Sequence, residues 1–118
     1  MNKNYAEYYN RIQQLMANLG QELPAPMAGF VQLHKAAVAE GALSTKTKEL
    51  IALAIAITVR CDGCISFHVH DALAAKANRQ EIAEAIGVAV LMGGGPSVVY
   101  GAEALDALST LEASDKFA

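Results

Sequence analysis

The chain has 118 residues, of which 53% are hydrophobic and 18% charged, and its net charge at pH 7 is -3. This length fits a single domain, residues 1–118, which can bury a core without metal or disulfide staples. The nine basic residues form no run, which argues against a nucleic-acid surface. The N-terminus lacks the apolar core of a signal peptide, and the most apolar run is about half a membrane span. We therefore expect a cytoplasmic protein without nucleic-acid or membrane partners.

The charged fraction is low for a small monomer, whose ratio of surface to volume is high. Part of the apolar surface is therefore expected to be buried between subunits. The sequence predicts a homo-oligomer on this ground.

Six segments have helical periodicity, and none has the sustained alternation that is typical of a strand. Gly20 is expected to end the first helix, and Pro26 and Gly41 to begin and end the second. The predicted architecture is one all-α domain of about six helices. The expected helices lie at about residues 4–19, 26–40, 44–59, 61–77, 78–92 and 96–111.

Two helix starts carry recognisable capping signals. Ser44 is an expected N-cap, and Asn78 with Glu81 three residues later resembles a capping box. Residues 93–95 are three glycines, which break the chain before Pro96 opens the last helix. The segments 50–57 and 86–92 are apolar nearly all round, so they are expected to be central or to lie between the core and a partner subunit.

A cysteine pair and a histidine form the main candidate site, in the stretch CDGCISFH. Cys61, Cys64 and His68 are separated by three and four residues, so on a helix they share one stripe. A Cys-x-x-Cys pair at a helix start can form and break a disulfide with little backbone movement, and the exposed N–H groups there favour thiolate. His68, one turn after Cys64, can accept its proton. The pattern predicts a thiol redox centre.

Two other interpretations of the cysteines stay open. Two cysteines and a histidine are three zinc ligands, with His70 or Glu49 as a fourth, although structural zinc sites usually draw ligands from two separated pieces of chain. The cysteines could also be inert core residues.

Glu49 is the remaining candidate, as the only acidic residue between Glu40 and Asp62. It stands near the start of an apolar helix, where a carboxylate can simply complement the helix dipole. The sharper interpretation is a partly buried proton carrier that faces the cysteines. His70 is expected at the surface or an interface, because it points about 200° away from His68. The tyrosines at positions 5, 8 and 9 are expected to form a packing stripe rather than a binding site.

These residues resemble a known family. The segment LSTKTKELIALA at 43–54, the stretch CDGCISFH, the segment ANRQEIAEAI at 77–86 and the turn GGGP at 93–96 are similar to the AhpD-like (alkyl hydroperoxidase D) group of the carboxymuconolactone decarboxylase family. The similarity extends over about residues 24–110, and the pattern of Glu49, eleven residues, Cys-x-x-Cys, three residues and His68 is specific.

The resemblance implies an all-α fold around a helical hairpin, trimers or hexamers of one chain, and a peroxidase without metal or bound cofactor. It makes Cys64 the attacking thiolate, Cys61 the resolving cysteine, and Glu49 with His68 the proton relay. The implied partners are a hydroperoxide substrate and an external dithiol reductant of the lipoyl or thioredoxin type. Gly63 stands where the longer members of the family carry a histidine, so a relay through that histidine is not expected here.

Two further functions remain as alternatives. The family's decarboxylases act on a lactone without a cysteine pair, so a cofactor-free lyase with His68 and Glu49 as acid–base groups is one. A non-catalytic metal-binding or redox-sensing module is the other.

Overall fold

The computed structural model describes residues 4–114, and the regular elements in this range are six α-helices, as predicted. Residues 1–3 and 115–118, which the single-domain prediction includes, lie outside the described range. The helices are α1 (Tyr5–Glu22), α2 (Pro24–Val38), α3 (Thr45–Thr58), α4 (Asp62–Ala74), α5 (Arg79–Gly93) and α6 (Gly95–Glu112).

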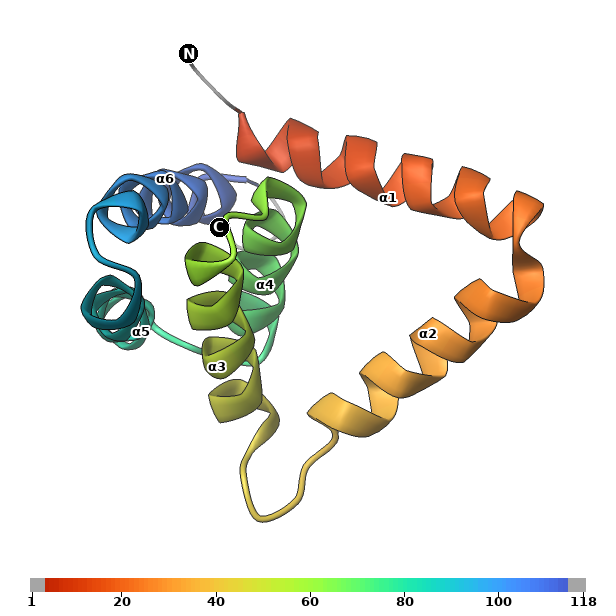
Figure 1. The fold of residues 1–118 in the computed structure, drawn as a ribbon, viewed down its shortest axis with the longest axis horizontal. Coiled ribbons are helices and arrows are strands. Elements are labelled where there is room, and N and C mark those ends of the chain that lie inside the picture. The colour runs from red at the N-terminus through yellow and green to blue at the C-terminus, as the bar shows by residue number, and fades with distance from the viewer. Residues whose placement is uncertain (1–3, 115–118) are drawn as a thin grey trace.

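The helices form a four-helix body and a two-helix arm (Figure 1). In the body, the hairpin of α3 and α4 packs against α5 and α6, and α1 crosses α4 and α6 before it leaves the body. The second helix, α2, turns back from the far end of α1 toward the start of α3 and has no buried residue. The predicted central hairpin is therefore α3–α4. The core is built by fully buried side chains from α1, α3, α4, α5 and α6, the largest of which are Tyr5, Leu53, Ile57, Ile65, Val69, Ile82 and Leu108.

The predicted ends of the first two helices are wrong. The first helix continues through Gly20 to Glu22, and α2 begins at Pro24, because the Leu23 N–H still closes the last turn on the Leu19 carbonyl at 2.8 Å. The proline after it has no N–H to continue that pattern. Helix α2 ends at Val38, before Gly41, and a bend leads to α3.

The helix starts with polar caps are confirmed. The Ser44 side chain accepts a hydrogen bond from Thr47 N, and Asn78 and Glu81 form the full capping box with distances of 2.8 and 2.9 Å. The glycine corner between α5 and α6 is confirmed as well, with Gly94 at φ 67°, which only glycine adopts freely.

The fourth helix is shorter than predicted at both ends. Cys61 is its N-cap rather than its first turn, and the helix ends at Ala74 instead of residue 77. Lys76 turns left-handed at φ 73°, and Ala77 N–H bonds back to Ala72 O at 2.9 Å. Four residues, 75–78, thus connect α4 to α5.

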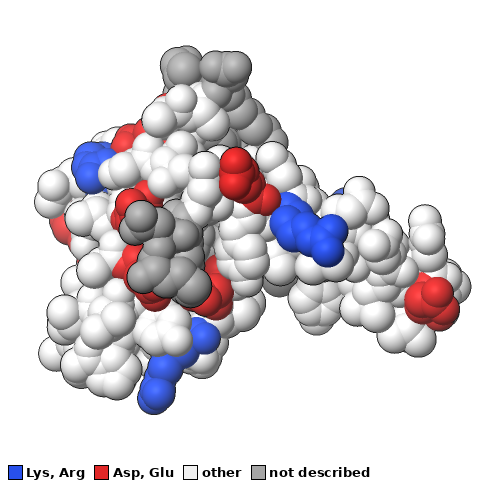
Figure 2. Space-filling view, turned by 90° about the horizontal axis from the view of Figure 1, so that it is seen from above, with Lys and Arg blue, Asp and Glu red and all other residues white. Residues whose placement is uncertain are grey.

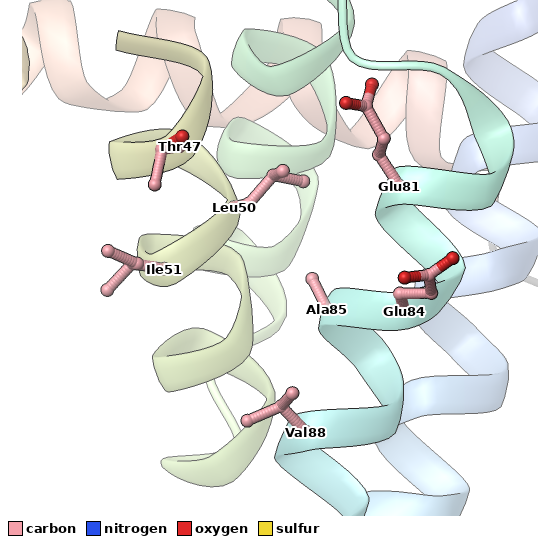
Figure 3. A pocket seen from close by; sticks show the side chains of 7 residues that line it. All are labelled: Thr47, Leu50, Ile51, Glu81, Glu84, Ala85 and Val88. Carbon is pink, nitrogen blue, oxygen red and sulfur yellow. The ribbon is translucent and has the colours of Figure 1, made fainter. Parts of the chain in front are cut away.

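The face of the molecule shown in Figure 2 is largely uncharged. Charged groups on the face shown are scattered, with wide uncharged areas between them. The two apolar helices α3 and α5 are only partly covered, and between them lies a groove of about 350 Å³ (Figure 3). No helix in residues 4–114 is both long and apolar enough to cross a membrane, and the cytoplasmic location stays a prediction. The exposed large apolar side chains of α3 and α5 include Ile51, Ile55, Val88, Leu91 and Met92.

Two glycines give a matched test of the packing between α5 and α6. A Cβ on Gly101 would lie 2.8 Å from Ile86 Cγ2, whereas a Cβ on Gly87 would meet nothing within 4 Å. We expect Gly101→Ala to lower the free energy of unfolding by about 1–3 kcal/mol. Gly87→Ala should raise it by about 0.5–1 kcal/mol, because alanine favours the helix. Urea unfolding measures both, and equal effects of the two substitutions would contradict the predicted close approach.

Candidate active site

The two cysteines are joined by a disulfide at the N-terminus of α4. The chain reverses between α3 and α4 at Arg60, whose φ is 61°, and Cys61 N–H then bonds to Ala56 O at 3.1 Å. This turn puts Cys61 in the N-cap position, where its Sγ accepts a hydrogen bond from Cys64 N at 3.2 Å. The Cα atoms of the pair are 5.2 Å apart, within the range that a disulfide needs. One of the two sulfurs thus lies on the positive end of a helix.

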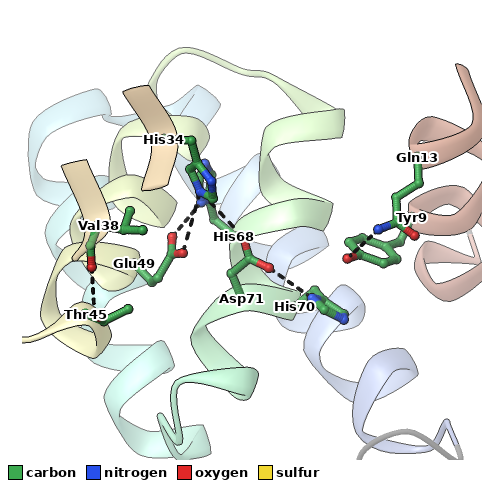
Figure 4. A network of polar contacts seen from close by, with 9 residues as sticks. All are labelled: Tyr9, Gln13, His34, Val38, Thr45, Glu49, His68, His70 and Asp71. Atoms are coloured by element: carbon green, nitrogen blue, oxygen red, sulfur yellow. Dashed lines mark hydrogen bonds and ion pairs between the residues drawn. The ribbon is translucent and has the colours of Figure 1, made fainter. Parts of the chain in front are cut away.

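His68 lies one turn after Cys64 and contacts Glu49 from α3 (Figure 4). The distance from His68 Nδ1 to Glu49 Oε1 is 2.9 Å, and the Glu49 side chain is 4% exposed. An ionised carboxylate only accepts hydrogen bonds, so Nδ1 donates to it, and Nε2 is left for proton transfer. The pair has the arrangement of a base held in position by a buried carboxylate.

The disulfide and His68 open onto one cavity of about 520 Å³. The cavity lies between the arm and α4, because its walls come from α1, α2, Cys61 and the length of α4 from Gly63 to Asp71. Its apolar walls are Ile12, Met16, Phe30, Val31 and Phe67, and its polar borders are Tyr9, His34, the cysteine pair, His68 and Asp71. A small organic molecule could therefore reach a sulfur and an imidazole from the same space.

His34 also belongs to this site, which the sequence did not indicate. From α2, its Nε2 lies 4.0 Å from Glu49 Oε2 and 3.9 Å from Asp71 Oδ2 (Figure 4). Its side chain is 42% exposed. The partners are 15 and 37 residues away in the sequence, beyond any helical spacing, so only the packing of the arm brings them together.

The expected surface position of His70 is wrong. His70 is buried, its Nδ1 lies 3.0 Å from Asp71 Oδ1, and its ring stacks on that of Tyr9 with centroids 4.1 Å apart. His70 is not exposed to solvent, because α1 packs against α4 and its Tyr9 ring covers the imidazole.

Tyr9 is more than the packing residue that the sequence predicted, since it also borders the cavity. Burial, and after it the charge of Asp71, raise the pKa of Tyr9, while a hydrogen bond from Gln13 lowers it. Tyr5 fits the packing interpretation, being fully buried in the core.

The proposed zinc ligands are engaged with other groups in this structure. The two sulfurs are bonded to each other, Glu49 holds His68, and the other candidate for a fourth ligand, His70, holds Asp71. A different donor set exists instead: His34, Glu49 and Asp71 each offer one atom, and these atoms lie within 4.8 Å of one another.

Known proteins resemble this chain over most of its length. The crystal structure of a carboxymuconolactone decarboxylase family protein from Legionella pneumophila is 43% identical, covers 93% of this chain and 98% of its own, and superposes with a TM-score of 0.88. An uncharacterised protein of Cupriavidus necator is 42% identical over 80% of this chain and 84% of its own length. The uncharacterised protein 4 in the cox locus of Paracoccus denitrificans is 39% identical over 70% and 75% respectively.

The family model described as the carboxymuconolactone decarboxylase family matches residues 24–107. This range contains α2 to α5 and most of α6, and with them Glu49, the cysteine pair and His68. The matching family model and the shared fold lead to one assignment: the chain belongs to the carboxymuconolactone decarboxylase family.

Proposed function

We propose that the chain is an AhpD-like thiol peroxidase, which reduces hydroperoxides with Cys64 and Cys61. The observation that carries the proposal is the shared cavity. A disulfide at a helix N-terminus and a histidine held by a buried carboxylate both border it. A lone disulfide could be structural, and a lone His–Glu pair could serve many reactions. Together in one space they supply a nucleophile, a resolving thiol and a proton donor.

The oxidative half-reaction starts from the reduced pair. The Cys64 thiolate attacks one peroxide oxygen, the O–O bond breaks, and Cys64 becomes a sulfenic acid. The departing alkoxide takes a proton from His68 and leaves as an alcohol. The Cys61 thiol then attacks the sulfenic sulfur, so that a disulfide forms and water leaves. The structure corresponds to this oxidised state.

The reductive half-reaction needs an external dithiol, of the lipoyl or thioredoxin type. Its thiolate attacks Cys64, the Cys61–Cys64 bond breaks, and the electron pair goes to Cys61. The leaving thiolate on Cys61 is favoured by the Cys64 N–H, which already donates to Cys61 Sγ. The second thiol of the donor then resolves the mixed disulfide, and the donor leaves oxidised.

The walls of the cavity favour an organic hydroperoxide over hydrogen peroxide. Ile12, Met16, Phe30 and Val31 supply apolar walls from α1 and α2, against which an alkyl group can be buried. Gly63 also borders the cavity, and a Cβ there would come no closer than 3.9 Å to Ile12 or Tyr8. Longer members of the family have a histidine at the position of Gly63, and this chain lacks it. The proposed proton relay therefore consists of His68 and Glu49.

A cofactor-free lyase is the alternative, because the His68–Glu49 pair borders the cavity whether or not the cysteines react. A lyase would use the same apolar walls and would need no dithiol. Loss of either sulfur therefore separates the two functions.

The cysteine substitutions give the first test of the proposal. Cys64→Ser should abolish dithiol-dependent consumption of an alkyl hydroperoxide, because the attacking sulfur is gone. Cys61→Ser should still form one sulfenic acid on Cys64, which dimedone traps and mass spectrometry locates. Trapping in Cys64→Ser but not in Cys61→Ser would reverse the order of attack, and consumption that survives Cys64→Ser would contradict the proposal.

Replacement of Glu49 tests the proton relay. Glu49→Gln keeps the shape of the side chain but removes the charge that holds a protonated His68. The rate of Cys64 oxidation by hydroperoxide should fall roughly 100-fold, as stopped-flow thiol measurements would show. Glu22→Gln, at the exposed C-terminal end of α1, is the matched control and should react at the wild-type rate.

We also propose that the chain is a homo-oligomer, a trimer or hexamer, whose interface includes the outer face of α3 and α5. Leu91 and Met92 of α5 are 79% and 73% exposed, and the groove between α3 and α5 is lined mostly by apolar groups (Figure 3). Apolar side chains so exposed on helices of low charge fit burial against a second copy of the chain.

A charge on this face tests the interface. Leu91→Lys should shift the mass measured by light scattering toward that of the monomer, because an unpaired lysine would be buried. Gln80→Lys, which adds the same charge at an exposed polar position of α5, should leave the mass unchanged. A monomeric wild-type protein would refute the oligomer.

A further inference from the structure

We infer that the groove on the arm, between α1 and α2, receives the C-terminal end of α5 from a second copy of the chain. The inference rests on the proposed homo-oligomer, and it names the two surfaces that meet and the direction of the contact. It also gives the oligomer a part in the redox centre, because the arm forms walls of the cavity.

The groove has a volume of about 530 Å³ and lies between the two helices of the arm. Its lining is mostly apolar, and several of its residues are small. At Gly20 a Cβ would come no closer than 4.0 Å to Met27 Cβ, so the groove is open at this point. An apolar hollow of this kind accepts bulky side chains from a partner. The lining includes Met16, Gly20, Ala28, Val31 and Lys35.

Helix α2 is little covered by its own chain. None of its 15 residues is buried, and it contains Pro26 and Gly29, which are poor helix formers. A helix of this length is only marginally stable in water without packing. The whole chain has an accessible surface of 7011 Å², against roughly 6100 Å² for a typical monomer of 12.4 kDa. The difference, about 900 Å², is close to the ~800 Å² that one partner buries in a standard interface.

The end of α5 is the occupant that best fits the groove. Leu91 and Met92 have the highest exposed fractions among the large hydrophobic side chains of the described residues, 79% and 73%. They belong to the last turn of α5, which contains no basic residue to balance the negative end of the helix dipole. Lys35 borders the groove and supplies that charge. The groove thus complements the end of α5 both in its apolar lining and in charge.

The two surfaces cannot meet within one chain. Figure 1 shows α2 and α5 on opposite sides of the α3–α4 hairpin. In its own chain α2 packs instead against α1 and α3. Surfaces on opposite sides of a chain suit a head-to-tail contact, in which each copy offers its groove to one neighbour and its α5 to another. Such contacts build a closed ring when the rotation between copies closes, which is the symmetry of the proposed trimer.

The docked end of α5 lies against the back of the cavity wall. Met16 and Val31 line both the groove and the cavity that contains the cysteine pair. Side chains from the neighbour therefore pack against residues that also face the substrate. The second copy holds the arm in place and, through these two residues, the shape of the cavity.

Light scattering of arm variants tests the contact. Ala28→Lys places a charge in the groove and should shift the mass of the folded protein from that of the oligomer to that of the monomer. Ala36→Lys, the same change at an exposed position of α2 that borders neither the groove nor the cavity, should keep the wild-type mass. Equal effects of the two lysines, or a wild-type mass of Ala28→Lys beside a monomeric Leu91→Lys, would overturn the inference and leave the oligomer standing. A monomeric wild type would overturn both.

A mixture of Ala28→Lys and Leu91→Lys tests the direction of the contact. Each variant alone lacks one of the two surfaces, but the intact groove of Leu91→Lys can take the intact α5 end of Ala28→Lys. We expect a species of two chains and no larger one, because the remaining groove and the remaining end both carry an added lysine. A mixture that stays monomeric would contradict the head-to-tail contact.

Hydrogen exchange gives a readout without any change in the arm. The amides of residues 24–38 should exchange roughly tenfold faster in Leu91→Lys than in the wild type, since α2 loses its cover. Exchange in residues 62–74, which form α4, should change less than about twofold. Equal exchange of α2 in the two proteins would sink the inference even if an arm variant failed to fold. None of these measurements uses a hydroperoxide, so their outcome is independent of the proposed peroxidase.

Discussion

The contact between Glu49 and His68 is the interaction on which the rest of the site depends. A buried carboxylate in an apolar helix is costly unless it is paired and hydrogen-bonded. The pairing at 2.9 Å meets this requirement, and it joins α3 to α4 one turn beyond the cysteines. The alignment of the α3–α4 hairpin is therefore tied to the position of the imidazole. Packing of α5 and α6 against the hairpin fixes this alignment within the core.

The helix start and the arm complete the centre in different ways. The left-handed turn at Arg60 sets Cys61 at the N-cap, where the backbone itself favours a thiolate. The arm contributes mostly apolar walls and one imidazole, and it is attached to the body by few buried groups. Rigid elements thus carry the chemistry, while a less firmly packed element encloses the substrate. A substitution in the arm should therefore change how substrate reaches the cavity and the charge around it, and should leave the disulfide unchanged.

The sequence could predict what local spacing determines. The positions of Cys61, Cys64 and His68 follow from intervals of three and four residues, and the capping box at Asn78 follows from its own four residues. Gly20 did not end its helix, because a glycine inside a helix is tolerated when the next turn can still close. The contact between Glu49 and His68 spans 19 residues. The position of Glu49 suggested a carboxylate that faces the cysteines, and the resemblance to a family paired it with His68. His34 and the buried position of His70 depend on where α1 and α2 lie, and no local pattern in the sequence contains that information.

The central claim is that the cysteine pair is oxidised by hydroperoxide in this cavity. The most direct measurement treats the fully reduced protein with one equivalent of cumene hydroperoxide, alkylates the free thiols and determines the mass of the peptides that contain residues 61–64. The account predicts an intramolecular Cys61–Cys64 disulfide and one equivalent of the corresponding alcohol. Two alkylated thiols and unconsumed hydroperoxide would contradict it.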